Sequence, residues 1–345
     1  MLKVVQVTAD DDAVTWDQYV LGHPSATGYH LMGWRWIIER AFAHPACYLM
    51  AKDTGGNVRG VFPLVFLSSR MFGRFLVSMP FVNYGGVLAD TTEAGQALLQ
   101  AAVRVARDLH AEHMEVRHYD RIYGQLPSKQ HKASMRLDLP SDYRTLWNLF
   151  PSKLRSQIRR AHKAGLTVKI GGEEILDDFY TVFARNSRDL GTPVYGPTFF
   201  KKIVEIFPKD ARVCVVYLEH QAVAAGILYG FRSALEIPWA ASDRRYNHLA
   251  SNMLLYSAVL RYACQEKFQV FDFGRSTPGS STYKFKEQWG AWPIPLSWAY
   301  WTCNGKAVPD ISPNNPKYQL AIRLWKRLPL GVANRLGPVI SKSIP

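Results

Sequence analysis

The stretch that decides the fold and the candidate chemistry is Phe271-Asp-Phe-Gly-Arg-Ser-Thr-Pro-Gly-Ser-Ser-Thr-Tyr-Lys-Phe-Lys-Glu-Gln-Trp-Gly290. A predicted strand, Gln269 to Phe273, ends here and breaks at Gly274. The turn-rich run that follows lets the backbone bend and point its N–H groups at a ligand. The cationic side chains Arg275, Lys284 and Lys286 can hold a phosphate or an oxyanion. Surface loops often carry solvated charges, so an ordinary exposed loop is the competing interpretation.

The composition is that of a folded, basic protein. The 345 residues suffice for two domains of ordinary size, and 48% of them are hydrophobic. The formal net charge of +14 attracts polyanions. Nucleic acid, an anionic membrane and a pyrophosphate-bearing substrate all satisfy that charge, so it does not choose among them.

Cysteine and histidine patterns argue against metal and disulfide chemistry. Cys47, Cys214, Cys264 and Cys303 stand far apart without a CxxC pair, and the ten histidines form no HxH or HxxxH pattern. We therefore expect no metal and buried thiols. The N-terminus meets acids early and lacks the apolar core of a signal peptide, and no run of about 18 apolar residues occurs. A cytoplasmic protein is expected, either free or peripheral on the inner face of the cytoplasmic membrane.

The order of predicted elements repeats along the chain. Each half reads as helix, antiparallel strands, long helix and strand, which predicts two copies of one α/β (α+β) module with mixed, mostly antiparallel sheets. We place an N-terminal domain at 1–140, a C-terminal domain at 141–305 and a basic tail at 306–345. The expected elements are helices at 29–42, 93–110, 175–190 and 251–266, and strands at 47–51, 58–68, 114–118, 131–139, 211–218, 223–231 and 234–241.

A basic helix is predicted at 152–164, with Ser152 as N-cap and Gly165 just past its end. Its apolar positions are Leu154, Ile158 and Ala161, whereas Arg159, Arg160 and Lys163 lie among cations with no acid to neutralise them. Such a helix presents either a solvated face or a site for a polyanion.

A second basic segment lies near the C-terminus. Lys317 to Leu328 predicts a helix with Ala321, Leu324, Trp325 and Leu328 on one face, and no acid follows Asp310. Two interpretations remain open: a terminal helix packed on the domain, or an in-plane anchor on anionic lipid formed by 317–345.

Several catalytic motifs are absent from the sequence. Gly-x-Ser-x-Gly, a Walker loop and GxGxxG do not occur, which leaves group transfer without a protein nucleophile. Asp243 to Asn252 leads into a helix, and a helix N-terminus favours phosphate through its free N–H groups and dipole. Acetyltransferases bind their donor's pyrophosphate in this way, but the glycine-rich form of that loop is missing here.

The residues just described resemble the FemAB/FemX family. The resemblance rests on the basic helix, on Asp243…Tyr246…Leu249-Ala-Ser-Asn-Met-Leu-Leu255, and on Phe271-Asp-Phe-Gly274 with Phe285-Lys286…Trp289-Gly290. Members are tandem GNAT-fold transferases that move an amino acid from aminoacyl-tRNA to an amine on a lipid- or nucleotide-linked cell-wall precursor. More narrowly, Arg188-Asp-Leu-Gly-Thr-Pro-Val194 and the basic tail resemble the branch associated with PEP-CTERM/exosortase and exopolysaccharide gene clusters.

The resemblance implies roles for individual residues. Lys286 would stabilise negative charge on the donor's ester carbonyl, with Phe285 beside it. The other implied site residues are Asn252, Tyr256, Arg275 and Lys284 for the donor, and Arg40, Tyr84, Arg159, Arg160 and Lys163 for the acceptor or its phosphates.

Three functions stay open on the sequence. The first is aminoacyl transfer from aminoacyl-tRNA to a lipid- or nucleotide-linked sugar or peptide, without a cofactor. The second is acetyl transfer from acyl-CoA to a surface polysaccharide. The third is a non-catalytic scaffold in an envelope synthesis complex.

Overall fold

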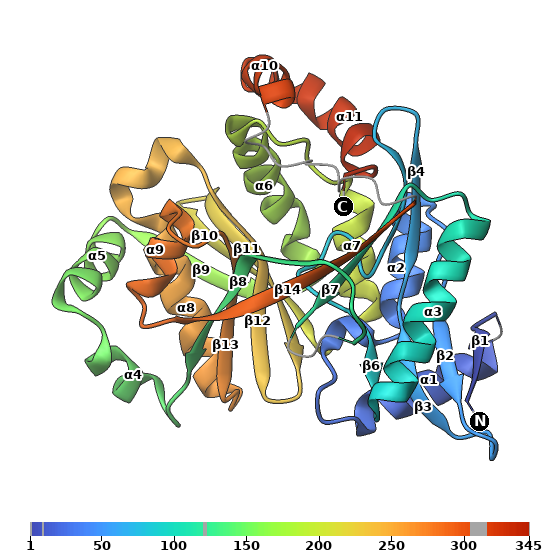
Figure 1. The fold of residues 1–345 in the computed structure, drawn as a ribbon. Helices are drawn as coiled ribbons and strands as arrows, with labels where there is room; N and C mark the ends of the chain where they lie inside the picture. The colour runs from blue at the N-terminus through green and yellow to red at the C-terminus, as the bar shows by residue number, and fades with distance from the viewer. Residues whose placement is uncertain (1, 9, 120–122, 304–315, 345) are drawn as a thin grey trace. The chain divides into compact units, whose positions relative to one another are not determined.

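A computed structural model describes residues 2–8, 10–119, 123–303 and 316–344. The chain groups into two compact units (Figure 1). Unit 1 comprises Met1–Lys132, Pro295–Ile311 and Lys342–Pro345, and unit 2 comprises Ala133–Ile294 and Ser312–Ser341. The predicted boundary at 305/306 lies outside the described residues.

Unit 1 holds two small sheets with helices packed on them. One sheet has the order β1-β2-β3-β6 and is antiparallel, and in the other β5 pairs antiparallel with β4 and parallel with β7, which pairs antiparallel with β14. The elements are β1 (Lys3–Gln6), α1 (Asp10–Gly22), the 3-10 helix η1 (Gly28–His30), α2 (Gly33–Phe42), β2 (Leu49–Lys52), β3 (Val58–Phe62), β4 (Val65–Ser69), β5 (Gly73–Val77), β6 (Leu88–Ala89), α3 (Thr92–Asp108), β7 (His113–His118) and β14 (Trp292–Thr302).

Helix α3 closes the core of unit 1. Its small residues Ala94 and Ala102 and its Leu98 are fully buried against the strands. A Cβ on Gly60 of β3 would come within 2.9 Å of the Leu98 side chain, so glycine lets the helix approach the sheet closely.

One strand predicted in unit 1 is wrong in extent. The expected strand at 58–68 is two strands, β3 pairing with β2 and β4 pairing with β5. Pro63 lies between them, and proline has no N–H to donate to a sheet ladder. The turn between β2 and β3 contains Gly56 at φ +83, a backbone conformation that favours glycine.

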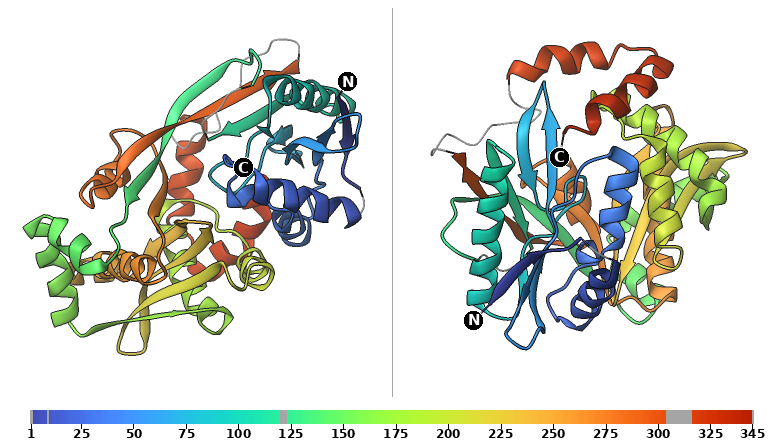
Figure 2. Two further views of the ribbon diagram at one scale, coloured as in Figure 1. Left: turned by 90° about the horizontal axis from the view of Figure 1, so that it is seen from below. Right: turned by 90° about the vertical axis from the view of Figure 1, so that its right-hand side faces the viewer.

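Unit 2 is built on a six-stranded sheet of order β8-β13-β12-β11-β10-β9, in which only the β12–β13 pair is parallel. The elements are β8 (Ser128–Asp138), α4 (Tyr143–Leu149), α5 (Ser152–Lys163), β9 (Leu166–Gly171), η2 (Glu173–Ile175), α6 (Leu176–Leu190), α7 (Pro197–Ile206), β10 (Ala211–Leu218), β11 (Gln221–Phe231), β12 (Ala234–Ser242), η3 (Arg244–Leu249), α8 (Ser251–Gln265), β13 (Val270–Ser276), α9 (Ser281–Glu287), α10 (Pro316–Trp325) and α11 (Leu330–Ser341). Figure 2 gives two further views of these elements.

The core of unit 2 lies between α8 and the sheet. Leu254, Leu260 and Ala263 of α8 are buried against Cys214 and Val216 of β10. Since side chains alternate across a strand, the neighbouring Val213 and Val215 face the other layer. Helix α6 packs on the same sheet through β11 and β12.

The stretch from Phe271 to Gly290 differs from the predicted loop. Strand β13 continues to Ser276, and the aromatic and basic cluster forms the short helix α9. Ser280 caps this helix by accepting a hydrogen bond from the Tyr283 N–H at 3.2 Å. Pro278 and Gly279 directly before the cap hid the helix, because both residues are typical of turns.

The two basic segments were predicted in part. In α5 the burial of Leu154, Ile158 and Ala161 is confirmed, and Gly165 has φ +77. The N-cap is Pro151, not Ser152, and it makes no side-chain cap bond. The C-terminal segment forms α10 and a second helix, α11, that was not predicted because glycine and proline, at 331, 337 and 338, disfavour helix.

Candidate functional site

Lys286 is held inside unit 2 by backbone carbonyls. It lies in the last turn of α9 with 7% of its surface exposed. Its ammonium donates to the carbonyl oxygen of Gly274 at 2.9 Å and to that of Arg275 at 3.1 Å. Both carbonyls belong to the end of β13, where Gly274 has φ +74. The strand end and the helix therefore fix the position of the Lys286 nitrogen.

Two buried carboxylates lie around this cation. Asp272 on β13 is 1% exposed and Glu236 on β12 is 6% exposed. Asp272 accepts hydrogen bonds from the Ser134 hydroxyl at 2.6 and 2.7 Å and from the Gly274 N–H at 2.7 Å. Asp272 thus ties β8 to β13 and holds the turn whose carbonyls receive Lys286.

Burial and these acids act on Lys286 in opposite directions. Loss of water around the ammonium lowers the pKa of Lys286 from its usual 10.5 to about 8, while the charges of Asp272 and Glu236 oppose that shift. Desolvation of a cation disfavours the charged form, and neighbouring anions favour it. The result is a lysine that is still mainly cationic at neutral pH.

The ammonium of Lys286 keeps bonding capacity for a ligand. A lysine ammonium carries three N–H donors, and within the described part of the chain two of them reach the carbonyls of Gly274 and Arg275. The third can donate to an oxyanion, which is the role that the sequence assigned to this residue.

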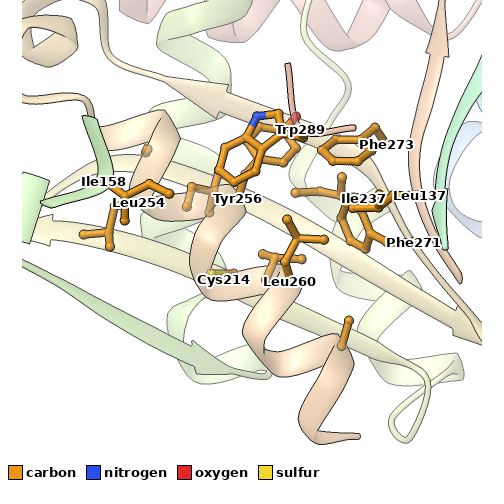
Figure 3. Close-up of a cluster of buried hydrophobic side chains, with 14 of the residues drawn as sticks. Leu137, Ile158, Cys214, Ile237, Leu254, Tyr256, Leu260, Phe271, Phe273 and Trp289 are labelled. Atoms are coloured by element: carbon orange, nitrogen blue, oxygen red, sulfur yellow. The ribbon is translucent and has the colours of Figure 1, made fainter. Parts of the chain in front are cut away.

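Aromatic side chains gather beside Lys286. Tyr256, Phe273 and Trp289 are buried together at one end of the unit 2 core (Figure 3). The Phe285 ring lies 5.1 Å from the ring of Tyr256 and 6.3 Å from that of Trp289. Burial raises the pKa of the Tyr256 hydroxyl, so this tyrosine is neutral. These rings form an apolar cluster, and Phe285 directly precedes Lys286 in α9.

The other predicted donor residues lie in two settings. Asn252 is half-buried in the first turn of α8, next to Ser251, whose buried hydroxyl has no hydrogen-bond partner among the described residues. Arg275 is half-buried, and its backbone holds Lys286. Lys284 is exposed on α9. Their roles stay predictions.

Helix α5 presents its cations to solvent. Arg159, Arg160 and Lys163 are all exposed, and none of them has an ion pair among those found in the described residues. The Arg159 guanidinium lies 5.6 Å from the centre of the Trp147 ring on α4. The arrangement is an unneutralised basic surface flanked by an aromatic ring.

Unit 1 contains a separate pocket that the sequence did not predict. Its volume is about 230 Å³. Its polar walls come from three histidines, one aspartate and two tyrosines, and a backbone run closes it: the lining is His23, Pro24, Ser25, His30, Gly86, Val87, Leu88, Ala89, Asp90, His118, Tyr119 and Tyr123.

The pocket histidines have distinct environments. The His30 ring bonds through Nε2 to the carbonyl oxygen of Gly86 at 3.1 Å and through Nδ1 accepts the Thr27 N–H at 3.1 Å, which fixes the tautomer with hydrogen on Nε2. His118 is 1% exposed, and its Nε2 has no hydrogen-bond partner among the described residues. Burial and the nearby His30 lower the pKa of His118 to about 4. His118 is therefore a neutral imidazole.

The predicted acceptor residues of unit 1 lie apart from one another. Tyr84 is buried behind the pocket wall, with its ring 4.8 Å from that of Tyr119 and 5.2 Å from that of Tyr29. Arg40 is exposed in the last turn of α2 and does not line the pocket. Their functional roles stay predictions.

Three residues near the candidate sites were not predicted from the sequence, although two of them stand out in it. Asp272 and Glu236 are single acids inside apolar strands, where a buried charge requires a partner. His118 ends β7, in which polar and charged residues alternate with Met114 and Val116, so the strand pattern did not single it out. Within the described residues no cluster of three or more histidine, cysteine or acidic side chains is arranged to hold a metal.

Comparison with known proteins defines the class of this fold. Residues 150–286 match the family model described as "Acetyltransferase (GNAT) domain". The structure is similar to "Crystal structure of FemX", with a TM-score of 0.65 at 16% identity over 93% of this chain and 100% of that one. It is also similar to a "Tandem GNAT protein from the clavulanic acid biosynthesis pathway", with a TM-score of 0.53 at 13% identity over 90% and 100%. The fold is that of tandem GNAT proteins, and residues 150–286 match the acetyltransferase (GNAT) domain within it.

One curated protein is similar to this chain in sequence. The chain is 24% identical over 164 residues to the UDP-N-acetylmuramoylpentapeptide-lysine N(6)-alanyltransferase of Weissella viridescens. The match covers 46% of this chain and spans about half, 48%, of the length of that relative. Together with the FemX structure, this relative agrees with the FemAB/FemX resemblance of the sequence.

Proposed function

We propose that this protein is an aminoacyltransferase that forms an amide bond on a cell-envelope precursor. The observation that carries the proposal is Lys286, a buried ammonium with two N–H groups bound to backbone carbonyls and a third left for a ligand. A preorganised cation in a water-poor site stabilises an oxyanion far better than water does.

The reaction is acyl transfer by direct attack. The acceptor amine attacks the ester carbonyl carbon of the donor, the carbonyl oxygen becomes an oxyanion, and Lys286 donates a hydrogen bond to it. The C–N bond then forms fully as the C–O ester bond breaks. The amine loses a proton and the leaving ribose oxygen gains one. We assign no protein base to this transfer, and the substrate itself or a water carries the proton.

The donor is proposed to be aminoacyl-tRNA. The exposed cations Arg159, Arg160 and Lys163 of α5 suit a phosphate backbone, and the Trp147 ring beside Arg159 suits a base. The alanyltransferase relative and the FemX fold are in line with this donor. No cofactor is required.

The acceptor is proposed to be a lipid- or nucleotide-linked sugar or peptide. The histidine pocket of unit 1 offers the neutral imidazole of His118 beside the hydroxyl and carboxylate groups of other lining residues, and these suit hydroxyl and amide groups of such a molecule. The sequence likeness of Arg188 to Val194 supports an exopolysaccharide precursor of the PEP-CTERM/exosortase type in particular. The protein would then work in the cytoplasm, peripheral to the inner face of the membrane.

The competing proposal is an acyl-CoA donor. The family model that matches residues 150–286 is an acetyltransferase, and the buried Ser251 hydroxyl at the start of α8 lacks a partner among the described residues. A helix start of this kind suits a pyrophosphate.

Ligand-dependent stability distinguishes the two donors. A ligand that binds only the folded protein raises its melting temperature. We expect charged tRNA to raise it, uncharged tRNA to raise it less, and acetyl-CoA to leave it unchanged. A rise with acetyl-CoA alone would favour the acetyltransferase, and a chain that responds to neither and transfers nothing would be a scaffold.

A further inference from the structure

Helix α11, the last helix of unit 2, buries its small residues and exposes its large ones. In α11 the buried residues are Ala333, Gly337 and Ser341, whereas Val332, Leu336 and Val339 are 41%, 47% and 62% exposed. A surface helix normally turns its large apolar residues toward the core. Helix α11 has the opposite arrangement, with small residues toward the core and large apolar residues toward solvent.

Specific contacts hold α11 in this orientation. A Cβ on Gly337 would come within 2.9 Å of the backbone of Val194, so glycine permits the close approach. The Ser341 hydroxyl donates to the Val194 carbonyl at 3.0 Å. The small-residue face is therefore the packed face, and the valines and leucine point away from unit 2.

Helix α10 also exposes large apolar residues, although it packs on unit 2 through the large side chain of Ile322 and not through small residues. A Cβ on Gly191 would meet the Ile322 side chain at 2.6 Å, and the Arg188 guanidinium donates to the Leu328 carbonyl just past the helix at 2.9 Å. On the opposite side Leu320 and Leu324, four residues apart, are 67% and 57% exposed. We call Leu320, Leu324, Val332, Leu336 and Val339 the outer face of the helix pair α10 and α11.

The outer face concentrates exposed apolar surface. Of the twelve large hydrophobic residues that are exposed in the described chain, five belong to it. The other seven are spread over six elements and loops between residues 14 and 292. Scattered exposed hydrophobics need no explanation, but a contiguous group marks an interaction surface.

Charge identifies the partner. Arg323, Arg327 and Arg335 are exposed. Arg323 lies three residues after Leu320, and Arg335 lies three residues after Val332 and four before Val339, spacings at which helical side chains are neighbours. Arg327 lies just past the end of α10. No aspartate or glutamate occurs between residues 311 and 345, whereas six lysines and arginines do. Aliphatic side chains interleaved with arginines and free of acids match the two layers of an anionic bilayer, acyl chains below and phosphates above.

We propose that the outer face docks this protein on an anionic lipid surface, with α10 and α11 lying in the plane of the interface. The exposed leucines and valines enter the acyl boundary, and the arginines contact lipid phosphates. Within the described residues no helix has the length and apolarity to cross a bilayer. Docking does not depend on the transfer chemistry, so it stands or falls separately from the proposed function.

The test is sedimentation of the full-length protein with vesicles of phosphatidylcholine, with and without phosphatidylglycerol. We expect binding only to the anionic vesicles, weakened by salt. Replacing Arg323, Arg327 and Arg335 by glutamine removes about 1 kcal/mol for each charge near the surface, which is a loss on the order of 10²-fold in affinity. Replacing Leu324 and Leu336 by serine is expected to abolish sedimentation.

Matched controls separate the outer face from net charge and hydrophobicity. Arg70, Arg104 and Lys209 are exposed elsewhere, and their replacement by glutamine removes the same charge. Leu21→Ser with Met71→Ser removes two other exposed hydrophobics. Both controls should sediment like the unaltered protein. Equal binding by the outer-face and control variants overturns the proposal. The proposal is also overturned if the unaltered protein does not bind vesicles and light scattering shows a dimer that Leu324→Ser/Leu336→Ser dissociates.

Discussion

The two units bury titratable bases in opposite electrostatic settings. Burial lowers the pKa of Lys286 in unit 2 to about 8 against the opposing charges of Asp272 and Glu236, so this lysine, whose nitrogen donates to two carbonyls, is mainly cationic at neutral pH. His118 in unit 1 is buried near another histidine, and its pKa falls to about 4. One group is therefore set to supply charge, and the other to supply a neutral hydrogen bond. Under the proposed function, the first group would stabilise an oxyanion and the second would bind a neutral polar ligand.

Removing the Lys286 cation should have the largest effect. Lys286→Met keeps a long apolar side chain without the ammonium, and we expect kcat for transfer to fall about 10²- to 10³-fold, as when an oxyanion donor is lost. The measurement is single-turnover transfer from charged tRNA. Lys209→Met, an exposed lysine of the same unit, is the control.

A structural role alone would give a different pattern. If Lys286 only held the Gly274 turn, the melting temperature and kcat would fall together. Lys286→Arg would then restore kcat only to the extent that it restores the melting temperature. Normal turnover in a folded Lys286→Met protein would show that Lys286 does not stabilise the oxyanion. The contrast drawn between Lys286 and His118 would then fail.

Asp272→Asn should destabilise the protein and weaken the lysine's charge. The carboxylate is 1% exposed and accepts from Ser134 and Gly274. Breaking one partner of a buried charged network costs about 3 kcal/mol in the free energy of unfolding. Urea unfolding measures this. Ser134→Ala, which removes one donor and no charge, should cost about 1 kcal/mol. Equal losses would mean that the charge of Asp272 is unimportant.

The pH dependence of transfer should follow Lys286. Its pKa of about 8 means that the cation is present below that pH and lost above it. We expect kcat/KM to fall about tenfold per pH unit above pH 8. Because Asp272 favours the charged form of Lys286, Asp272→Asn should shift this fall in kcat/KM to lower pH. A limb that stays in place in that variant would show that another group titrates.

Much of the fold was predictable because its signals are local. Strand β10 was predicted at its observed bounds, Ala211–Leu218, and α8 to within one residue, since apolar periodicity over long elements is strong evidence. The missed helices α9 and α11 contain or follow glycine and proline, and only tertiary contacts make them helical. The extra break at Pro63 has a different origin, since proline has no N–H for a sheet ladder and this local signal was passed over.

The candidate site was predictable in its residues but not in its arrangement. Phe285 and Lys286 stood out through a family resemblance. Their environment depends on Asp272 and Glu236 from different strands, and sheet order between distant strands cannot be read from local pattern. The histidine pocket was missed for the same reason, because η1, the end of β7 and the segment at 86–90 are far apart in sequence.

His118→Gln should have the smallest effect, and it tests the neutral side of the comparison. The pocket would lose the imidazole Nε2, which has no partner among the described residues, while glutamine keeps a polar group of similar size. Loss of one neutral hydrogen bond to the acceptor corresponds to about 1 kcal/mol, so KM for the acceptor should rise about fivefold with kcat unchanged. The exposed His220→Gln is the control. Because the folded pKa of His118 lies below its usual 6.5, unfolding takes up a proton between those values, and acid lowers stability there. His118→Gln should therefore reduce the loss of stability between pH 6.5 and about 4. A fall in kcat that follows the imidazole instead would make His118 a proton carrier, and the division between a charged unit and a neutral unit would fail.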